Sequence, residues 1–422
     1  MHLILHAGQH PRRNAVCAVK CPNLPVFPEG RAKLVPPSGP AMPAVIRGEG
    51  ESTELIFILD WLGAGESIVC SLEPADPSEA PVLCAEQTDR GVSITKNGDF
   101  LTEYYTGTDL AKPYLGPLCD RYGAQVTRLD FAAKEHPHHR SLWISHGRVN
   151  GVDTWNEPAG THGFIRNRGL HGCVSSRLMA AFTADNVWTD HGGKPLLDES
   201  TAYRIYAPEP AKTVIDLEIR LTAAYGPVTL GATKEAGPLA VRMADSLRVS
   251  ETGTMKNGVG GINEDEIWMH RAPWVDYAGL CDGRACGVAV LDNPANEGFP
   301  SYWHARNYGL LAVNNFYRVG AADHGGVISG LQQPRPRPDD KLFRFSRQGQ
   351  TELFQRFRRR LKSNRAENQV VFAAYSRPPA GNRVCQIPGE HRGDFGGGKR
   401  RNPLAAGRYD VPCMCHTVRL PF

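Results

Sequence analysis

Apolar positions along the chain form short runs that favour β-strands over helices. The clearest run is 213–221, Thr-Val-Ile-Asp-Leu-Glu-Ile-Arg-Leu, where apolar and polar residues alternate as in a strand with one buried face. Similar runs, bounded by Gly, Asp, Asn or Pro, predict strands at 54–59, 66–72, 92–95, 100–105, 124–131, 142–145, 201–206, 239–243, 287–291, 310–313 and 327–331. No segment before residue 340 keeps a helical period over three turns. Many strands with few helices predict an all-β fold, an antiparallel sandwich or barrel.

The strand-rich region is flanked by two stretches of different character. Residues 1–45 are rich in Pro and Gly with little periodicity, so we expect an irregular N-terminal extension. Residues 46–345 carry the strand signals and form the predicted main domain. Residues 346–422 are basic and rich in Pro and Gly, and apart from a candidate basic helix at 351–362 they predict a poorly ordered tail. A nucleic-acid-binding arm, or a segment never selected to fold, is the alternative for this tail.

Composition narrows the class of protein. The 44 Gly and 32 Pro among 422 residues fit many short strands joined by tight turns. The longest apolar stretches are strand-sized, and the N-terminus lacks a basic region followed by a long apolar core. We therefore expect neither a membrane span nor a signal peptide, and a cytoplasmic location.

The net charge and the cysteine content are also typical of a cytoplasmic protein. The net charge is +4, and residues 335–365, with nine Arg and two Lys, account for the whole surplus. The rest of the chain is close to neutral, so we do not expect a nucleic-acid partner. The eleven cysteines lack the spacing of a disulfide framework, which favours reduced thiols. Cys413 and Cys415 precede His416, but no second pair lies nearby to complete a zinc site.

Histidines gather in one part of the chain. Six of the fifteen, at 136, 138, 139, 146, 162 and 171, fall within 36 residues. Because Pro137 favours an extended conformation for the residue before it, we expect His136 and His138 on one side of the chain and His139 on the other. Imidazole titrates near neutrality and is the commonest ligand of transition metals. These histidines therefore suit proton transfer or a divalent metal, with structural or surface histidines as the alternative.

A second segment, 150–157, combines a turn with polar and aromatic residues. Its Asn-Gly pair predicts a turn, and Asp153 and Trp155 follow just after it. A carboxylate can bind the hydroxyls of a sugar and an indole can stack on its C–H face. The alternative is a core tryptophan beside polar residues that cap the turn.

Two later segments add further candidates. At 234–242, Glu235 is a candidate general acid or base and Arg242 a candidate clamp for a carboxylate or hydroxyl, although Lys234 beside Glu235 also fits plain surface charge. At 292–309, a polar loop that contains Asn293 leads into a strand-like aromatic–polar alternation, which favours a binding cleft. The candidate binding residues of this alternation are Trp303, His304, Arg306 and Tyr308. No phosphate-binding loop, nucleophile elbow or His-Glu-x-x-His motif occurs in the chain.

Taken together, these segments resemble the bacterial PmoA-like proteins, a family of unsettled activity. The matching stretches are Lys-Pro-Tyr-Leu-Gly-Pro-Leu at 112–118, Val-Thr-Arg at 126–128, His-Pro-His-His-Arg-Ser-Leu-Trp at 136–143, Asn-Gly-Val-Asp-Thr-Trp at 150–155, Trp-Val-Asp-Tyr at 274–277 and the segment 293–309. The resemblance runs from about residue 45 to about 345. Members usually continue with one or two further strands after a segment like 343–347, and this sequence departs from the family there.

The resemblance implies a fold and a group of activities. The implied fold is a large antiparallel β-supersandwich, galactose-mutarotase-like, which hosts epimerases, glycosidases and polysaccharide lyases. The label "methane oxygenase PmoA", common for such proteins, belongs to a membrane-embedded enzyme, and this chain has no predicted span.

We therefore expect an enzyme that acts on a sugar or uronate, as a hydrolase, lyase or epimerase. In this hypothesis His136, His138 or His139 exchange protons or hold a divalent metal, and Glu235 is the second acid or base. The predicted substrate-binding residues are Arg128, Trp143, His146, Asp153, Trp155, Arg242, Asn293, Trp303, His304, Arg306 and Tyr308. The alternatives are a non-catalytic glycan-binding protein and a metal-dependent oxygenase, which needs three converging ligands.

Overall fold

The computed structural model describes residues 1–317 except 23, 77, 121, 130–134, 210–211, 236–238, 295 and 297, and the strands at 327–331, 341–345, 368–375 and 415–419. This part of the chain is nearly all β-strand. Its helical elements are α1 (Asn263–Ile267) and three single 3₁₀ turns (Pro28–Gly30, Gly50–Ser52 and Asp245–Leu247). The predicted all-β fold of antiparallel sheets is confirmed. No helix in the described ranges is long and apolar enough to span a membrane.

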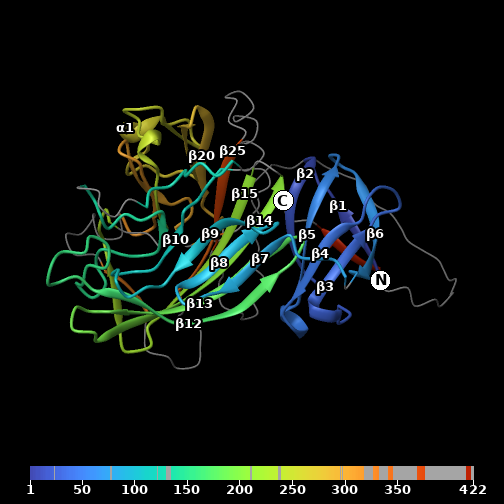
Figure 1. Cartoon of the computed structure of the whole chain (residues 1–422), viewed down its shortest axis with the longest axis horizontal. Helices are drawn as coiled ribbons and strands as arrows, with labels where there is room; N and C mark the ends of the chain where they lie inside the picture. The colour runs from blue at the N-terminus through green and yellow to red at the C-terminus, as the bar shows by residue number, and fades with distance from the viewer. Residues whose placement is uncertain are drawn as a thin grey trace, which may run out of the picture.

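Two large sheets form a sandwich (Figure 1). The eight-stranded sheet has the order β21 (Tyr302–Arg306), β22 (Leu310–Asn314), β17 (Leu239–Arg242), β11 (Leu142–Trp143), β10 (Tyr114–Gly116), β9 (Asp99–Tyr105), β8 (Gly91–Lys96), β7 (Leu83–Gln87). The nine-stranded sheet has the order β12 (Phe164–Ser175), β13 (Met179–Thr189), β14 (Pro195–Glu209), β15 (Lys212–Thr222), β24 (Lys341–Phe345), β25 (Asn368–Tyr375), β20 (Arg284–Leu291), β19 (Trp274–Cys281), β18 (Thr254–Asn257). A separate pair joins β16 (Val228–Gly231) to β23 (Val327–Leu331).

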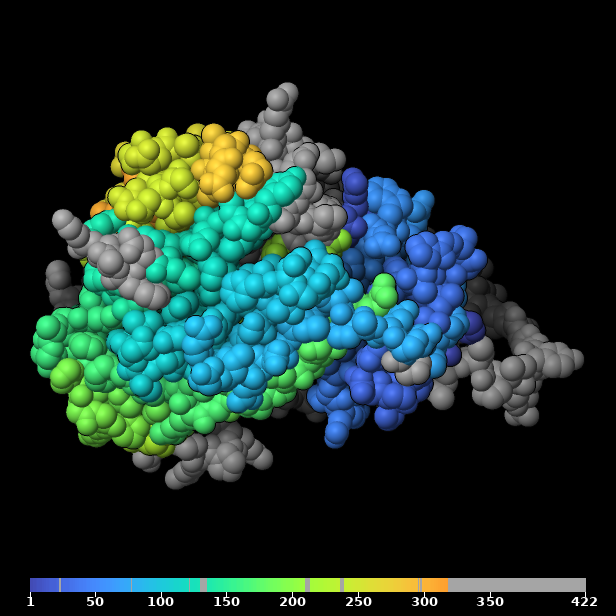
Figure 2. Space-filling view, viewed as in Figure 1, coloured from blue at the N-terminus to red at the C-terminus, as the bar shows by residue number. Residues whose placement is uncertain are grey.

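The predicted irregular extension at 1–45 is wrong, because these residues supply four strands of a third sheet. Its order is β2 (Arg12–Lys20), β5 (Glu54–Leu62), β4 (Met42–Arg47), β3 (Arg31–Val35), β6 (Ser67–Pro74), β1 (His2–His6), β26 (Cys415–Arg419). This sheet has its own apolar core, and a smaller cluster packs Val45 and Ile56 against Met179 and Tyr206 of the sandwich. The N-terminal residues, blue in Figure 2, gather at one end of the molecule.

Most predicted strands are present with shifted ends, and 213–221 lies inside β15. Among the described residues of 124–131, only isolated bridges occur, at Gln125 and Thr127, so a continuous strand there is wrong. The tail adds strands at β25 and β26, which the sequence did not predict. The candidate helix at 351–362 lies outside the described residues.

Alternation along the strands of the eight-stranded sheet gives it two different faces. Leu142, Val241, Leu311 and Trp303 point into the core shared with the nine-stranded sheet. Their neighbours along the same strands lie on the opposite face, where a second cluster contains Trp143, Ala240, Leu310, Ala312, Tyr114 and Trp155. This second face carries the candidate functional site.

Candidate functional site

Two rows of residues cross the second face of the eight-stranded sheet. Strand register places Trp143, Ala240, Ala312 and His304 side by side on four neighbouring strands. The alanines between the two rings leave room above the sheet, and Trp155, from the loop after β11, packs there. Its ring lies 5.3 Å from that of Trp143 and 6.2 Å from that of His304. In the next row Arg242, Leu310 and Arg306 are neighbours.

The histidine segment folds into a tight turn over this face. His136 has φ +47°, in the left-handed region, and its carbonyl accepts a hydrogen bond from His139 N (3.0 Å). The predicted extended conformation of His136 is therefore wrong. A non-glycine residue in that region costs on the order of 1–3 kcal/mol and persists only when its surroundings hold it there. Arg128 helps to do so, because its Nη2 donates to the carbonyls of Glu135 (3.2 Å) and His136 (2.8 Å).

The turn stacks rings from distant parts of the chain. The His136 ring lies parallel to those of Tyr308, at 4.7 Å, and His139, at 4.9 Å. His139 in turn stacks on Trp143 at 5.1 Å, and His138 meets the His139 ring edge-on at 4.4 Å. Offset stacking and edge-on contacts are the favourable geometries of such rings. The predicted His136, His138, His139, Trp143 and Tyr308 are thus brought together.

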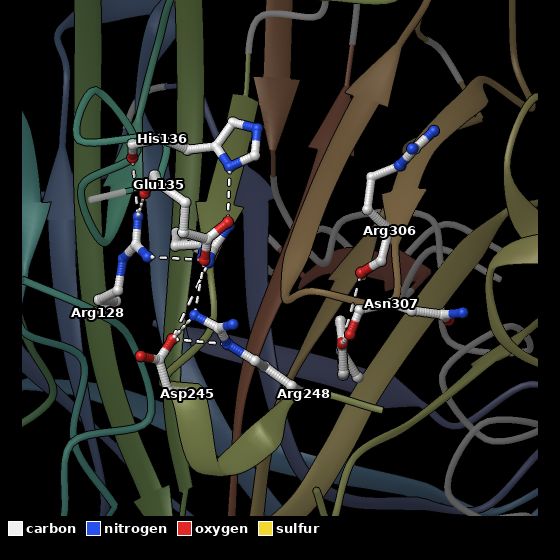
Figure 3. Close-up of polar contacts among 9 residues, drawn as sticks. Arg128, Glu135, His136, Asp245, Arg248, Arg306 and Asn307 are labelled. Atoms are coloured by element: carbon white, nitrogen blue, oxygen red, sulfur yellow. Dashed lines mark hydrogen bonds and ion pairs between the residues drawn. The ribbon is translucent and has the colours of Figure 1, made fainter. Parts of the chain in front are cut away.

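A carboxylate that was not singled out, Glu135, joins this stack to a group of arginines (Figure 3). Its Oε1 accepts hydrogen bonds from Arg242 Nη2 and Arg248 Nη2, each at 2.6 Å, and lies 3.4 Å from Arg128 Nη1. Its Oε2 accepts from His136 Nδ1 at 2.8 Å. Partial burial opposes ionisation of Glu135, but His136, Arg242 and Arg248 together lower its pKa to about 2. Glu135 is therefore a carboxylate at neutral pH.

A buried ion cluster lies beside the same rings. Glu157 accepts hydrogen bonds from Lys112 Nζ (2.5 Å) and from both Nη atoms of Arg140 (2.7 and 3.0 Å). Lys112 also donates to the Trp155 carbonyl (2.9 Å). Burial would raise the pKa of Glu157, yet the two cations lower it to about 2, while burial lowers the pKa of Lys112 to about 8. Both pKa values can fall together because the partners are unequal in number. Glu157 has two cationic partners, which outweigh its burial, whereas Lys112 shares one carboxylate with Arg140, which does not offset its own burial.

Burial keeps several site histidines neutral. It lowers the pKa of His138 to about 3, with the charge of Lys112 as the next cause. It also lowers the pKa of His139, with His138 as the next cause, and the pKa of His304 to about 3. His138 Nε2 and His139 Nδ1 are buried and have no hydrogen-bond partner among the described residues. A neutral imidazole can donate through one nitrogen and accept through the other, so each of these atoms has an unused hydrogen-bonding capacity.

Strand β21 presents His304 and Arg306 to the site. His304 lies between Trp155 and Trp268, with ring centroids 6.2 and 6.3 Å apart. Arg306 lies over the Trp268 ring at 4.1 Å and pairs with Glu264 at 3.2 Å. Trp303 lies on the core face, where its Nε1 donates to the Ala272 carbonyl (2.8 Å), so it is not part of the site.

Other predicted residues have structural partners elsewhere. His146 is buried, shares a hydrogen bond with the Gly231 carbonyl (2.9 Å) and packs on Phe316. Asp153 Oδ1 accepts from the backbone N of Trp155 (2.8 Å) and of the next residue, which caps the turn.

Asn293 is fully buried in the loop after β20. Glu235 Oε2 accepts from Thr233 (3.0 Å) and Glu235 Oε1 pairs with Lys234 (3.3 Å). No side-chain hydrogen bond or ion pair among the described residues joins Glu235 to the stacked histidines. It therefore does not supply the carboxylate of the histidine stack.

The predicted divalent metal at His136, His138 or His139 has no complete set of ligands in the described part of the chain. No group of three or more His, Cys, Asp or Glu side chains there is placed to hold an ion. His136 and His139 stack face to face, and imidazole lone pairs lie in the ring plane, so the stacked rings do not aim their lone pairs at one point.

Four charged residues of the site were missed: Glu135, Glu157, Lys112 and Arg248. Glu135 directly precedes the stretch 136–143, Glu157 ends the segment 150–157, and Lys112 opens the stretch 112–118. Their positions beside the singled-out motifs were a usable signal for these three. Arg248 had none, because nothing near it in the sequence marks it.

Comparison with known proteins gives a family but no activity. No curated protein matches the sequence. A family model matches residues 91–334, more than half of the chain, and includes both strand rows and the histidine turn. Its description names no activity and does not mention PmoA, so that resemblance stays a prediction. The chain belongs to a family of unknown function, DUF6807.

Proposed function

We propose that this protein is an enzyme that acts on a carbohydrate, with His136 as the group that exchanges a proton with the substrate. The observation that carries the proposal is the Glu135–His136 pair, set among stacked rings on the face of the sheet that turns away from the core. Stacked rings and hydrogen-bonding side chains are the two features with which proteins bind sugars.

The pair has the geometry of a base held by a carboxylate. Because Glu135 is ionised and can only accept, His136 Nδ1 carries the proton of the 2.8 Å hydrogen bond, and in the neutral ring the free lone pair is on Nε2. A carboxylate in this position fixes the tautomer of the ring and stabilises the imidazolium that forms when Nε2 takes a proton. His136 is also 39% exposed, so a substrate can reach it.

Neighbouring groups fit the binding of hydroxyls. His138 Nε2 and His139 Nδ1, which have no hydrogen-bond partner in the described part of the chain, belong to the same group of rings, whose centroids are 4.4–5.9 Å apart. The proposal leaves hydrolase, lyase and epimerase chemistry open, since each needs a base of this kind.

The two rival functions have less support. A glycan-binding module predicts histidines far from the aromatic residues, whereas here both share one stack. A metal-dependent oxygenase needs three converging ligands, and the described residues do not supply them.

The test is turnover of a panel of neutral and acidic oligosaccharides, followed by product analysis. We expect His136→Gln to lower kcat by about 100-fold or more with little change in KM, as loss of a general base does. His171→Gln is the matched control, because His171 is exposed on β12 and paired with Asp185, away from the stack. Binding without any turnover by the native protein, or full activity of His136→Gln, would reject the proposal.

A further inference from the structure

We propose that Arg242 and Arg248 bind a carboxylate of the substrate, so that the substrate is an acidic sugar, and that Glu135 Oε1 occupies this place until the substrate arrives. This deepens the proposed function, and it rests on that function for the carbohydrate part of the substrate. The two arginines come from β17 and from the turn after Asp245–Leu247, and both donate to Glu135 Oε1. Both also lie within 4.0 Å of Asp245 Oδ1.

Three arginines converge on one carboxylate oxygen. Arg242 Nη2 and Arg248 Nη2 lie 2.6 Å from Glu135 Oε1, and Arg128 Nη1 lies 3.4 Å from it. Arg248 also pairs with Asp245 at 2.7 Å. Arginine side by side with arginine repels unless anions lie between them, and the planar guanidinium matches a carboxylate with two parallel hydrogen bonds.

Arg242 gives a second, independent observation. Its side chain is fully buried, and its Nε and Nη1 have no hydrogen-bond partner among the described residues. Buried donors almost always have partners, and one left without a partner costs free energy. Its guanidinium also lies 4.9 Å from the Tyr308 ring, which stacks on His136. Arg242 therefore contacts two groups that themselves contact the proposed base, the Tyr308 ring and Glu135.

The arginine group is reachable from solvent on one side. The side chains of Glu135 and Arg248 are 39% and 27% exposed. An incoming carboxylate would compete for the donors that now bind Glu135 Oε1. The other oxygen, Oε2, would keep its hydrogen bond with His136, so the base stays oriented while the substrate binds.

The present occupant of the arginine pair indicates the ligand class. Arginine binds the oxygens of both carboxylates and phosphate esters. Here Arg242 and Arg248 bind a carboxylate oxygen, which a carboxylate of the substrate can replace in the same geometry. We therefore commit to a uronate rather than a sugar phosphate.

The experiment is calorimetric titration of the full chain with D-glucuronate, D-glucose, D-glucose 6-phosphate, D-glucose 6-sulfate and acetate. We expect the uronate to bind about 10-fold or more tightly than glucose, and more tightly than either ester or acetate. Arg248→Ala should abolish the preference over glucose. Glu135→Gln, a weaker competitor for the arginines, should strengthen uronate binding several-fold.

Arg90→Ala is the matched control, because Arg90 is an exposed arginine paired with Glu103 and should leave every affinity unchanged. Equal binding of glucuronate and glucose, tighter binding of an ester, or a preference that survives Arg248→Ala would overturn the inference. Uronate preference without turnover would reject the enzyme and keep the carboxylate site. Turnover of neutral sugars that needs His136, without uronate preference, would do the reverse.

Discussion

Glu157 holds together a buried cluster of three charges, and its replacement by Gln gives a sharp test of the structure. Its side chain is 16% exposed, while that of Lys112 is 2% exposed and Arg140 is also buried. The amide would keep the shape of the side chain and remove its charge. Lys112 and Arg140 would then both lose the carboxylate that accepts their hydrogen bonds.

The expected loss follows from the pKa of Glu157. Its fall from an ordinary 4.5 to about 2 corresponds to about 3 kcal/mol of net interaction with Lys112 and Arg140. Removal of one partner of a buried ion pair costs about 3–5 kcal/mol, which is of the same size. We therefore expect Glu157→Gln to reduce the free energy of unfolding by about 3 kcal/mol, measured by urea denaturation at pH 7.

The pH dependence adds a second check. Glu157 has a lowered pKa, so its contribution is present above about pH 4.5 and is lost as the pH falls toward 2. The native protein and Glu157→Gln should therefore converge in stability under acid. The control is Glu29→Gln, which removes an exposed pair with Arg31 (3.2 Å) and should change stability by less than about 1 kcal/mol. Equal urea midpoints for the two variants at pH 7 would refute the buried cluster.

Two further predictions concern individual rings. Burial lowers the pKa of His304 to about 3. Between pH 6.5 and 5 this histidine therefore gains a proton in the unfolded chain but not in the folded chain. This difference lowers the free energy of unfolding by about 1–2 kcal/mol. His304→Phe should therefore make urea midpoints fall less steeply between these pH values, and an unchanged slope would contradict the buried neutral ring. Trp303→Phe removes the hydrogen bond to the Ala272 carbonyl and should cost about 1–2 kcal/mol of stability without altering saccharide binding. Weaker saccharide binding would place Trp303 in the site after all, and Tyr308→Ala, which removes a ring of the stack, is the comparison.

Local sequence determined the strands and the place of the histidines. The alternation of 213–221 is a property of one segment, and it became β15 because any sheet would bury its apolar positions. The histidines at 136, 138 and 139 lie so close along the chain that any fold would bring them near one another. The alternation of 303–306 likewise placed His304 and Arg306 on one side and Trp303 on the other, although it did not show which side faced the core.

Tertiary structure decided the partners. Glu135 meets Arg242 and Arg248 across 107 and 113 positions of the chain, and no local pattern encodes such a contact. The strands of 1–45 were missed because Pro and Gly mask their pattern, and β1 is completed by backbone hydrogen bonds to β6 more than 60 positions away. The spacing of hydrophobic residues along the chain predicts only the local conformation of one segment. The pairing of strands, the face that becomes buried and the charges that meet depend on segments that are neighbours only after the chain has folded.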